Sequence, residues 1–499
     1  MTTNRHHSSW LRALLLLGLA VVLAGTTAAC AKARSAAGTS VSSPTPPAAS
    51  PSPSSTIAAF HTSGYLPQQV DGPHQLYGSG SDVTLPDAEP HDATGVRMYL
   101  IGGRMYDHPV AQAQYGLALL TSYQRHHDPA LLALALKQAG RIIAHRTVAK
   151  GAWFYPYPFG FALHNNPKEM ERAPWYSGMA QAQALSLFVR LAVVTGDPRW
   201  QQAAAATFDS FLAPPSDGAP WVAHVDNAGY LWIDEYPERP APASDLTYNG
   251  QMFGVVGLYD FVHYPSAAAR RRLPIALQML DGAETTAEHY ASVIRNPGFV
   301  SRYCLQDGTL NAQYHAIHVV QLSHLYTLTQ DQAFARAADD LRRDYPTPEV
   351  TGTIHVIPGT YQLARFDAAS GRQIASTQLT LGRGTTLPTL YRQRILGQGI
   401  WLKIGEGPYK DWWVKERAGR VWLGGVSAAV SYWPARPIGV DGSVTSYVLD
   451  QAGRAVGTKT ARLAHATVLV DQTADVNGRE SWHVVSGPLA GTWLPVTRP

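Results

Sequence analysis

Cysteine is almost absent from this chain of 499 residues, which contains only Cys30 and Cys304. Because Cys30 lies in the N-terminal segment discussed below, the mature chain offers Cys304 no disulfide partner. A metal site built from several thiolates is excluded for the same reason. The fold must therefore depend on packing, and we expect no bound metal and no cofactor.

Concentrated charge is also missing. Asp, Glu, Lys and Arg make up 15% of the residues, and the formal net charge is only +4. No basic run is interleaved with aromatic side chains, as a nucleic-acid surface would require, and no Gly-rich phosphate loop occurs. We therefore expect no nucleic-acid partner.

The N-terminus is typical of an exported protein. A basic start is followed by a short apolar stretch at residues 13–25 and by small residues before Cys30, which describes an export signal and not a membrane span. Cys30 follows two alanines and resembles the lipidation site of bacterial lipoproteins, although Thr27 stands where Leu is usual. We predict a signal peptide at 1–30 and a lipid anchor at Cys30 on the outer face of the bacterial cytoplasmic membrane. Cleavage without lipid, which would give a secreted protein, is the alternative.

The composition changes several times after the signal. Residues 31–58 are rich in Ala, Ser and Pro and cannot form a core, so they should act as a linker. Residues 59–105 contain Pro, Gly and strand-like pieces, which predicts a short β lead-in. Helical patterns dominate residues 106–346, and alternating strand patterns with Gly turns follow from residue 350.

The helical part repeats. Junctions between helices recur at Asp128, Asp197, Tyr264 and Asp331, with spacings of 67 to 69 residues. Each junction joins an apolar helix to an amphipathic one, with Asp, Pro or Ser at the N-cap and first turn. Helix-pair repeats of this length predict an (α/α) toroid in which the long loops between hairpins meet at one mouth. A plain helical bundle is the alternative.

The C-terminal all-β region also repeats. Gly407-Pro408 with Trp413 returns as Gly487-Pro488 with Trp493, at an offset of 80 residues. We predict two SH3-like β modules, at 350–418 and 419–499. Their tryptophans and tyrosines would suit binding to a cell-wall glycan, but the same rings can equally form the cores of small β modules.

Aromatic and ionisable residues are concentrated in the loops between the helices and at the helix starts, where functional residues of a rigid scaffold tend to gather. Aromatic faces stack on sugar rings, and amides hydrogen-bond to hydroxyls. The His315-x-x-His318 pair on one helix is also a weak metal motif, but no third ligand lies near it in sequence. The candidate substrate-binding residues are Tyr155, Tyr157, Trp175, Tyr176, Gln181, Asn249, Arg302, His315 and His318.

Several motifs occur in one collinear order: His108–Leu117, Trp175–Gln181, Glu235-Tyr236-Pro237, Asn249-Gly250 with Gly257–Asp260, and Tyr314-His315-x-x-His318 with Gln321-Leu322. In this order they resemble the catalytic C-terminal domain of D-glucuronyl C5-epimerases, over roughly residues 106–345. The resemblance implies a helical toroid that acts on a uronic-acid polysaccharide and inverts C5 without cleaving the polymer. Members of the family are often dimeric, so a homodimer is one expectation.

The resemblance places the family's catalytic residues on Glu235, Tyr236, Tyr303 and Tyr314. The C5 proton of a uronate is very weakly acidic, so one group must remove it from one face and another must return a proton to the opposite face. Glu235 suits the base if its loop desolvates it, and Tyr314 suits the partner if a positive neighbour lowers its pKa. Tyr303 could donate to the ring or glycosidic oxygen, and Tyr236 could orient the sugar.

One stretch departs from the family. An Asp-Leu-Arg-His sequence follows the family's equivalent of Tyr303, whereas this chain has Cys304-Leu305-Gln306-Asp307. The cation that pairs with the substrate carboxylate is then either lost or supplied by Arg302, His315 or His318.

The departure leaves two alternatives to an epimerase. One is a polysaccharide lyase or glycosidase on the same toroid. Glycosidases usually need two placed carboxylates, and only Asp234 and Glu238 lie close to Glu235 in sequence. The other alternative is a non-catalytic glycan-binding protein of the cell surface.

Overall fold

The computed structural model describes residues 57–496, except 79, 265, 349–350, 368–370 and 452. The export signal, Cys30 and the linker up to residue 56 lie outside the described residues. The expectations about export and lipidation therefore stay predictions.

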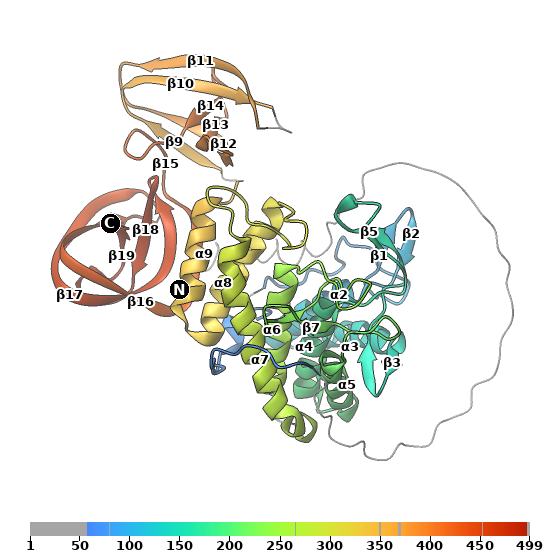
Figure 1. The fold of residues 1–499 in the computed structure, drawn as a ribbon. Helices are drawn as coiled ribbons and strands as arrows, with labels where there is room; N and C mark the ends of the chain where they lie inside the picture. The colour runs from blue at the N-terminus through green and yellow to red at the C-terminus, as the bar shows by residue number, and fades with distance from the viewer. Residues whose placement is uncertain are drawn as a thin grey trace.

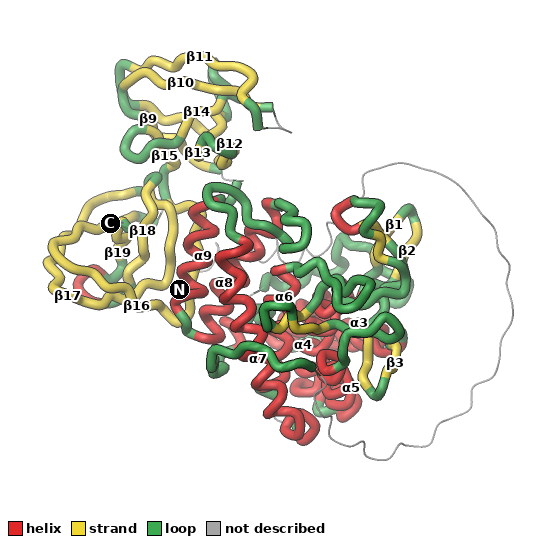
Figure 2. The backbone as a smooth tube through the Cα atoms, viewed as in Figure 1, coloured by secondary structure: helices red, strands yellow, loops and turns green. Residues whose placement is uncertain are grey.

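Helical hairpins form the larger part of the described chain (Figures 1 and 2). The four pairs are α2 (Pro109–His126) with α3 (Pro129–Ala144), α4 (Gly178–Thr195) with α5 (Pro198–Phe208), α6 (Tyr248–Val262) with α7 (Ala267–Ile294), and α8 (Ala312–Thr329) with α9 (Gln332–Asp344). The first helix of each pair contacts its counterpart in the next pair, so α2, α4, α6 and α8 form one row. This confirms the predicted domain of repeating helical hairpins.

The junctions follow from local sequence. Asp128, Asp197 and Asp331 are the N-caps of the second helices, and each side chain accepts a hydrogen bond from a backbone N–H of the first turn. In the third hairpin this role falls to Ser266, two residues after the junction expected at Tyr264. Gly196 ends α4 in the left-handed conformation, which glycine adopts without strain.

The first helices of the pairs are buried around most of their circumference. Fourteen of the 15 residues of α6 are buried, and the start of α2 is buried from Pro109 to Ser122. A helix that is enclosed on nearly all sides has no solvent-facing polar side, so its polar residues, such as Gln181 and Asn249, are buried as well. Among the described helices, α4 alone has the length and hydropathy of a membrane span, and 78% of it is buried inside the domain.

Short β-hairpins and 3-10 turns occupy the connections. The hairpins are β1 (Tyr99–Ile101) with β2 (Arg104–Tyr106), β3 (Thr147–Ala149) with β4 (Ala152–Phe154), β5 (Phe161–Ala162) with β6 (Met170–Glu171), and β7 (Ala223–Val225) with β8 (Leu231–Ile233). The 3-10 turns are η1 (Gly72–His74), η2 (Leu163–Asn165), η3 (Asp209–Leu212) and η4 (Gly487–Leu489). Within the expected β lead-in, the described strands are β1 and the first residues of β2.

The C-terminal region is all-β and forms two units, a sheet and a barrel; in Figure 1 the barrel lies beside α9 and α8, and the sheet lies above the barrel. The first is a seven-stranded sheet of β9 (Gly352–Val356), β10 (Gly359–Phe366), β11 (Gln373–Leu381), β12 (Thr385–Ile395), β13 (Gly399–Ile404), β14 (Trp413–Lys415) and β15 (Val421–Leu423). The second is a closed barrel of β16 (Val426–Leu449), β17 (Ala455–Val476), β18 (Arg479–Val484) and β19 (Thr492–Pro495). The all-β character is confirmed.

The SH3-like character of the two units is not confirmed, because they differ in strand number and strand length. The division between them also lies later than the expected 418/419, since β15 pairs with β9 of the first unit. Trp493 is buried in the barrel, and Trp412 and Trp413 pack partly buried against the core of the sheet. The three rings therefore do not form an exposed row.

Ion pairs join the helical domain to the barrel and the barrel to the sheet. Asp475 of the barrel accepts hydrogen bonds from Arg342 of α9, at 3.1 Å, and from Arg392 of the sheet, at 2.7 Å. Burial alone would raise the pKa of Asp475, but the two guanidinium groups lower it to about 2. Arg342 also pairs with Glu480 of the barrel, and Arg392 also pairs with Glu416 of the sheet, so the junction is a network of buried ion pairs.

Glu284 of α7 gives a stability prediction. Its side chain is fully buried, and neither carboxylate oxygen has a hydrogen-bond partner among the described residues. Burial and the nearby charge of Asp281 raise the pKa of Glu284 to about 8. The unfolded chain releases this proton near the ordinary pKa of Glu. Wild-type stability should therefore fall between these two pKa values as pH rises, by roughly 1.4 kcal/mol per pH unit.

Glu284→Gln removes this loss. The difference in Tm between the variant and the wild type should widen from pH 5 to pH 8 and then level off, as measured by thermal unfolding at a series of pH values. Glu406→Gln, which changes an exposed carboxylate, is the control and should show a constant difference. A Glu284→Gln difference that does not depend on pH would refute the assignment.

Candidate active site

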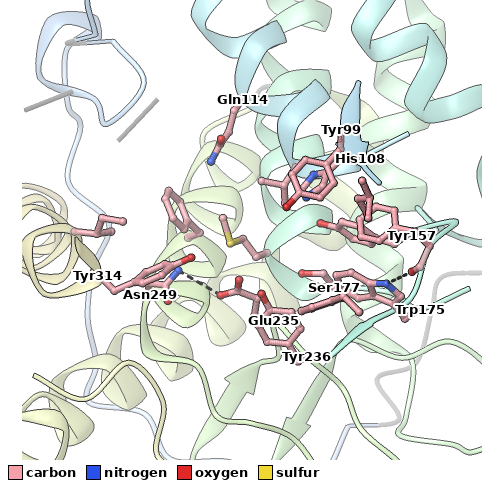
Figure 3. A pocket seen from close by; sticks show the side chains of 17 residues that line it. Tyr99, His108, Gln114, Tyr157, Trp175, Ser177, Glu235, Tyr236, Asn249 and Tyr314 are labelled. Carbon is pink, nitrogen blue, oxygen red and sulfur yellow. Dashed lines mark hydrogen bonds between the residues drawn. The ribbon is translucent and has the colours of Figure 1, made fainter. Parts of the chain in front are cut away.

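A pocket of about 760 Å³, including its open mouth, lies at the end of the domain where the first helices of the hairpins begin (Figure 3). Its lining includes the N-cap residues His108 of α2 and Ser177 of α4, and Asn249 and Tyr314 from the first turns of α6 and α8. Since helix N-termini carry partial positive charge, four such ends favour an anionic ligand.

Glu235 lies at the centre of the pocket (Figure 3). It follows β8 and faces the first turn of α6, where Asn249 Nδ2 donates to its Oε2 at 3.3 Å. Tyr303 Oη donates to Oε1 at 3.4 Å. A methyl group at Gly250 would lie 2.7 Å from the Cβ and Oε2 atoms of Glu235, so α6 can approach this carboxylate only because residue 250 is glycine.

Burial determines the protonation of Glu235. The residue is 7% exposed, and desolvation together with the charge of Asp245 raises its pKa to about 8, against hydrogen bonds from Tyr236, Tyr303 and Asn249. A carboxyl group with this pKa can lose and regain a proton near neutral pH. The loop therefore desolvates Glu235, which is the condition under which Glu235 was expected to suit the role of base.

Three tyrosines surround Glu235. The rings of Tyr303 and Tyr314 lie 4.3 Å apart, and Tyr236 lines the pocket beside the carboxylate. Desolvation by burial, followed by the charge of Glu235, raises the pKa of each of the three phenols. The expectation that a positive neighbour lowers the pKa of Tyr314 is therefore wrong, and the phenol stays neutral and able to donate a proton.

Aromatic rings form one wall. Tyr157 stacks on Trp175 with ring centroids 3.7 Å apart, and the Trp175 indole N–H donates to the carbonyl of Phe159. Trp175 also lines a second, larger hollow of about 1590 Å³, which contains the exposed cations Lys168, Arg172 and Arg239. The two cavities therefore share one aromatic residue.

Two predicted histidines lie outside the pocket. His315 Nδ1 accepts a hydrogen bond from the backbone N–H of Ser301, and His318 Nδ1 lies 3.0 Å from the Ser301 hydroxyl. Both rings are buried, and desolvation lowers the pKa of His315 to about 4 and that of His318 to about 3. Both histidines are neutral and hold the segment before Tyr303. Neither therefore supplies the cation that was expected to pair with the substrate carboxylate.

Four other residues that were predicted to bind substrate also lie outside the lining of the pocket. Arg302 is exposed and donates to the carbonyl of Val293. The buried Tyr155 hydroxyl is bonded to Thr207, and the buried Gln181 amide is bonded to backbone atoms of residues 153 and 155 and to Ser210. Tyr176 lines the second hollow. Of the predicted residues, the pocket brings together Glu235, Tyr236, Tyr314, Tyr157, Trp175 and Asn249, with Tyr303 in contact with Glu235.

Sequence reasoning missed several lining residues. His108 and Ser177 directly precede helices inside the quoted motifs, so their N-cap position was the available signal. His108 is neutral, because burial lowers its pKa to about 4. Gln114 lies further along α2, whereas Tyr99 comes from β1 and carried no signal. No Arg or Lys is among the described lining residues.

Comparison with known families adds to this geometry. Residues 149–343 match the model of the D-glucuronyl C5-epimerase C-terminus. The resemblance to D-glucuronyl C5-epimerases is confirmed. The matched segment contains Glu235, Tyr303 and Tyr314.

Individual relatives are distant. The D-glucuronyl C5-epimerase of Caenorhabditis elegans is 22% identical over 204 residues, which cover 38% of this chain and 31% of the relative. The chain thus spans about a third of the length of that curated relative. Among solved structures, the cellobiose 2-epimerase of Bacillus thermoamylovorans has 14% identity and a TM-score of 0.37, with 59% of this chain and 72% of the other covered. A family 76 glycoside hydrolase (mannosidase) of Bacteroides thetaiotaomicron has 12% identity and a TM-score of 0.28, with coverages of 49% and 58%.

The environment of Glu235 predicts its titration. Because burial raises its pKa, the carboxyl should be largely protonated at pH 7 and ionise around pH 8. Difference infrared spectroscopy between wild type and Glu235→Gln should show the band of one protonated carboxyl group at pH 6, which is lost by pH 10. A difference spectrum that shows only carboxylate at pH 6 would refute the desolvated environment.

Proposed function

We propose that this protein inverts C5 of uronic acid residues in a polysaccharide. The observation that carries the proposal is a desolvated Glu235 in contact with Tyr303 and close to Tyr314, inside the segment that matches the epimerase family. The substrate class comes from that family, and the pocket supplies the acid and base groups.

The proposed reaction has two proton transfers. The carboxylate form of Glu235 removes the C5 proton from one face, and the neutral phenol of Tyr314 gives a proton to the opposite face. The carboxyl group then holds one proton more, and the phenol one fewer. Tyr303 hydrogen-bonds to both groups, so it can return the proton to Tyr314 and reset the site. Tyr236 orients the sugar beside Glu235.

The substrate carboxylate needs compensation for its charge, which grows as C5 loses its proton. The described lining contains no Arg or Lys. Helices α2, α4, α6 and α8 all begin at the pocket, and the aligned backbone dipoles of each helix favour negative charge there. Helix ends thus take the place of the cation that the Cys304–Asp307 stretch lacks.

A polymer needs more room than one sugar. The second hollow continues from Trp175 and carries Lys168, Arg172 and Arg239 on exposed positions. Glu169, Glu171 and Glu238 line the same hollow, so its charges are mixed, and its size beside the pocket is what suits neighbouring residues of a polymer. This arrangement supports a polymer over a free monosaccharide as the substrate.

The alternatives fit the pocket less well. A glycosidase of the usual kind needs two carboxyl groups across the bond, and Glu235 is the only acidic residue among the described lining residues. A lyase would use the same proton abstraction and then lose the substituent at C4, so only its product distinguishes it. A purely glycan-binding protein would not need a base with a raised pKa.

Its location and partners are part of the same proposal. Export, a lipid anchor at Cys30 and the Ala/Ser/Pro linker would hold the enzyme at the outer face of the membrane, within reach of a surface polysaccharide. Contact of the C-terminal β units with cell-wall glycan and assembly as a homodimer complete the proposal.

Proton exchange tests the reaction directly. Incubation of the purified protein with a glucuronate-containing polymer in D2O should place deuterium at C5 without shortening the polymer, as followed by NMR. The rate should rise with pH through about 8, because the base must be ionised. Glu235→Gln and Tyr314→Phe should lower the rate by roughly 10²–10⁴-fold.

Tyr326→Phe is the matched control, because Tyr326 lies on α8 but packs against Tyr432 and not in the pocket. Its exchange rate should equal that of the wild type. A new unsaturated product would overturn the epimerase in favour of a lyase. No exchange with several different uronans would overturn catalysis in favour of binding.

Two helical glycines give an independent test. Gly250→Ala should displace Glu235 and lower the exchange rate strongly, because the added methyl group has no space beside the carboxylate. Gly140→Ala on α3 adds the same group in open space, and it should raise stability by about 1 kcal/mol and leave exchange unchanged. Equal exchange rates in the two folded variants would refute the close approach of α6 to Glu235.

A further inference from the structure

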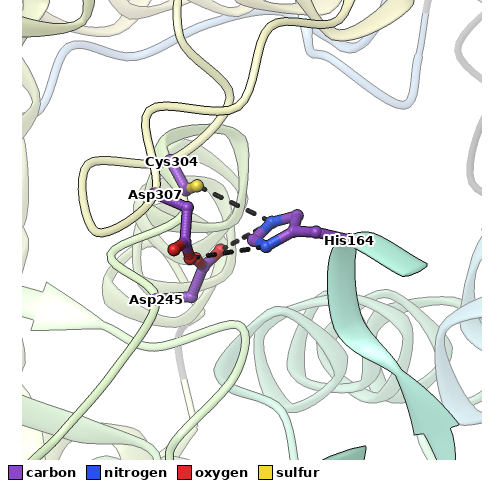
Figure 4. Close-up of side chains that lie close together, drawn as sticks. All are labelled: His164, Asp245, Cys304 and Asp307. Carbon is purple, nitrogen blue, oxygen red and sulfur yellow. Dashed lines mark hydrogen bonds and ion pairs between the residues drawn. The ribbon is translucent and has the colours of Figure 1, made fainter. Parts of the chain in front are cut away.

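Four side chains that can bind metals lie together outside the pocket. His164, Asp245, Cys304 and Asp307 each offer one ligand atom, and these atoms lie within 4.8 Å of one another (Figure 4). They come from three connections: the 3-10 turn η2, the loop before α6, and the segment between α7 and α8. None of them lines the pocket.

The spacing fits a tetrahedral cation. His164 Nε2 lies 3.6 Å from Cys304 Sγ and 3.7 Å from Asp245 Oδ2. Around tetrahedral zinc, ordinary bond lengths place nitrogen and sulfur ligands about 3.6 Å apart, and nitrogen and oxygen ligands about 3.4 Å apart. His164 Nε2 therefore already has nearly the separations from Cys304 Sγ and Asp245 Oδ2 that a shared cation requires.

The second nitrogen of His164 is also oriented. Its Nδ1 lies 3.0 Å from Glu169 Oε2 and 3.4 Å from Asp307 Oδ2. A carboxylate behind a metal-binding histidine fixes the tautomer that leaves Nε2 free to bind, and such partners are usual in metal sites. The ring thus points Nε2 at the buried pair of Asp245 and Cys304.

Asp245 supplies a second, independent observation. Its side chain is 0% exposed, and its Oδ1 accepts no hydrogen bond within the described part of the chain. Thr247 Oγ1 donates to Oδ2 at 2.7 Å. A buried carboxylate oxygen without a partner is costly, and a cation would satisfy it.

The charge around the cluster is negative. Glu169 and Asp307 lie beside His164, and Glu238 is close enough for the charges of Asp245, Asp307 and Glu169 to act on it. Among the described residues, the only ion pair of Asp245 is with His164. The local excess of acidic groups favours a divalent cation.

We propose that His164 Nε2, Asp245 and Cys304 bind one divalent cation of the zinc class, with Asp307 as the fourth ligand and Glu169 holding His164. Asp307 Oδ2 lies 3.4 Å from His164 Nδ1 and must turn from there to reach the cation, and because its side chain is 38% exposed, packing does not prevent this turn. Cys304 binds as the thiolate and releases its proton to solvent. The site does not depend on the proposed epimerase activity.

The position of the cluster explains what the cation would do. Cys304 directly follows Tyr303, and it pairs with Thr247, the N-cap of α6. The backbone N–H of Tyr248 donates to the carbonyl of Tyr303 at 3.1 Å. A cation bound here would fix the segment that carries Tyr303 against the start of α6, which carries Asn249. Its role is structural, beside the pocket and not within it.

Cobalt binding tests the site, because thiolate-bound Co²⁺ absorbs in the near ultraviolet. The full chain with Cys30→Ser retains Cys304 as its only thiol. Titration of this chain with Co²⁺ alone should produce the thiolate-to-cobalt band with one equivalent bound, and Zn²⁺ should displace it. Zn²⁺ should also raise the Tm of this chain.

Substitutions locate the ligands. The band should be lost in Cys30→Ser/Cys304→Ser and in Cys30→Ser/His164→Ala, with circular dichroism to check that each variant folds. Cys30→Ser/His483→Ala is the matched control, because His483 also lies beside a carboxylate, at 2.7 Å from Asp471, and should keep the band. Absence of the band in the Cys30→Ser chain, or its survival in either cluster variant, would overturn the proposal. C5 exchange is a separate readout, so failure of either proposal is distinguishable from failure of the other.

Discussion

The common direction of α2, α4, α6 and α8 is the constraint on which the site depends. Each hairpin returns the chain to the end from which it started, so every first helix begins at the same end of the domain. Burial around these helices fixes their positions, and the connections gather at that end. The pocket is therefore a consequence of hairpin packing, and the partial positive charges of four helix N-termini lie around it.

Close approach of α6 turns this arrangement into a reactive site. Gly254 lies against Ile233, and Gly257 lies against the backbone of Ala182 on α4, where a methyl group would come within 2.6 Å of the carbonyl oxygen. Together with Gly250 they form one glycine face that brings α6 against β8 and α4. Glu235, at the end of β8, is enclosed by the same contact. The backbone packing that stabilises the domain thus also raises the pKa of its central carboxylate.

The sequence predicted features that depend on local signals. Asp N-caps at a regular spacing predicted the hairpins, and collinear motifs predicted the loop that carries Glu235 and the helix start that carries Tyr314. Prediction from the sequence failed where buried polar groups have a structural role. His315 and His318 looked like ligands for a substrate, but their ring nitrogens hold Ser301. A sequence pattern does not distinguish a histidine that binds the backbone from one that faces a cavity.

Tertiary contacts explain the remaining differences. The sequence repeat between the two β units does not reveal that one forms a seven-stranded sheet and the other a closed barrel, because strand pairing is set by long-range register. Cys304 lies 140 residues from His164, so no spacing motif joins them. The Cys304–Asp307 stretch looked in sequence only like the loss of a cation. In the fold it places a thiol and a carboxylate beside His164 and Asp245, directly after Tyr303, while four helices begin at the pocket. The same stretch thus contributes two of the four side chains of the proposed cation site.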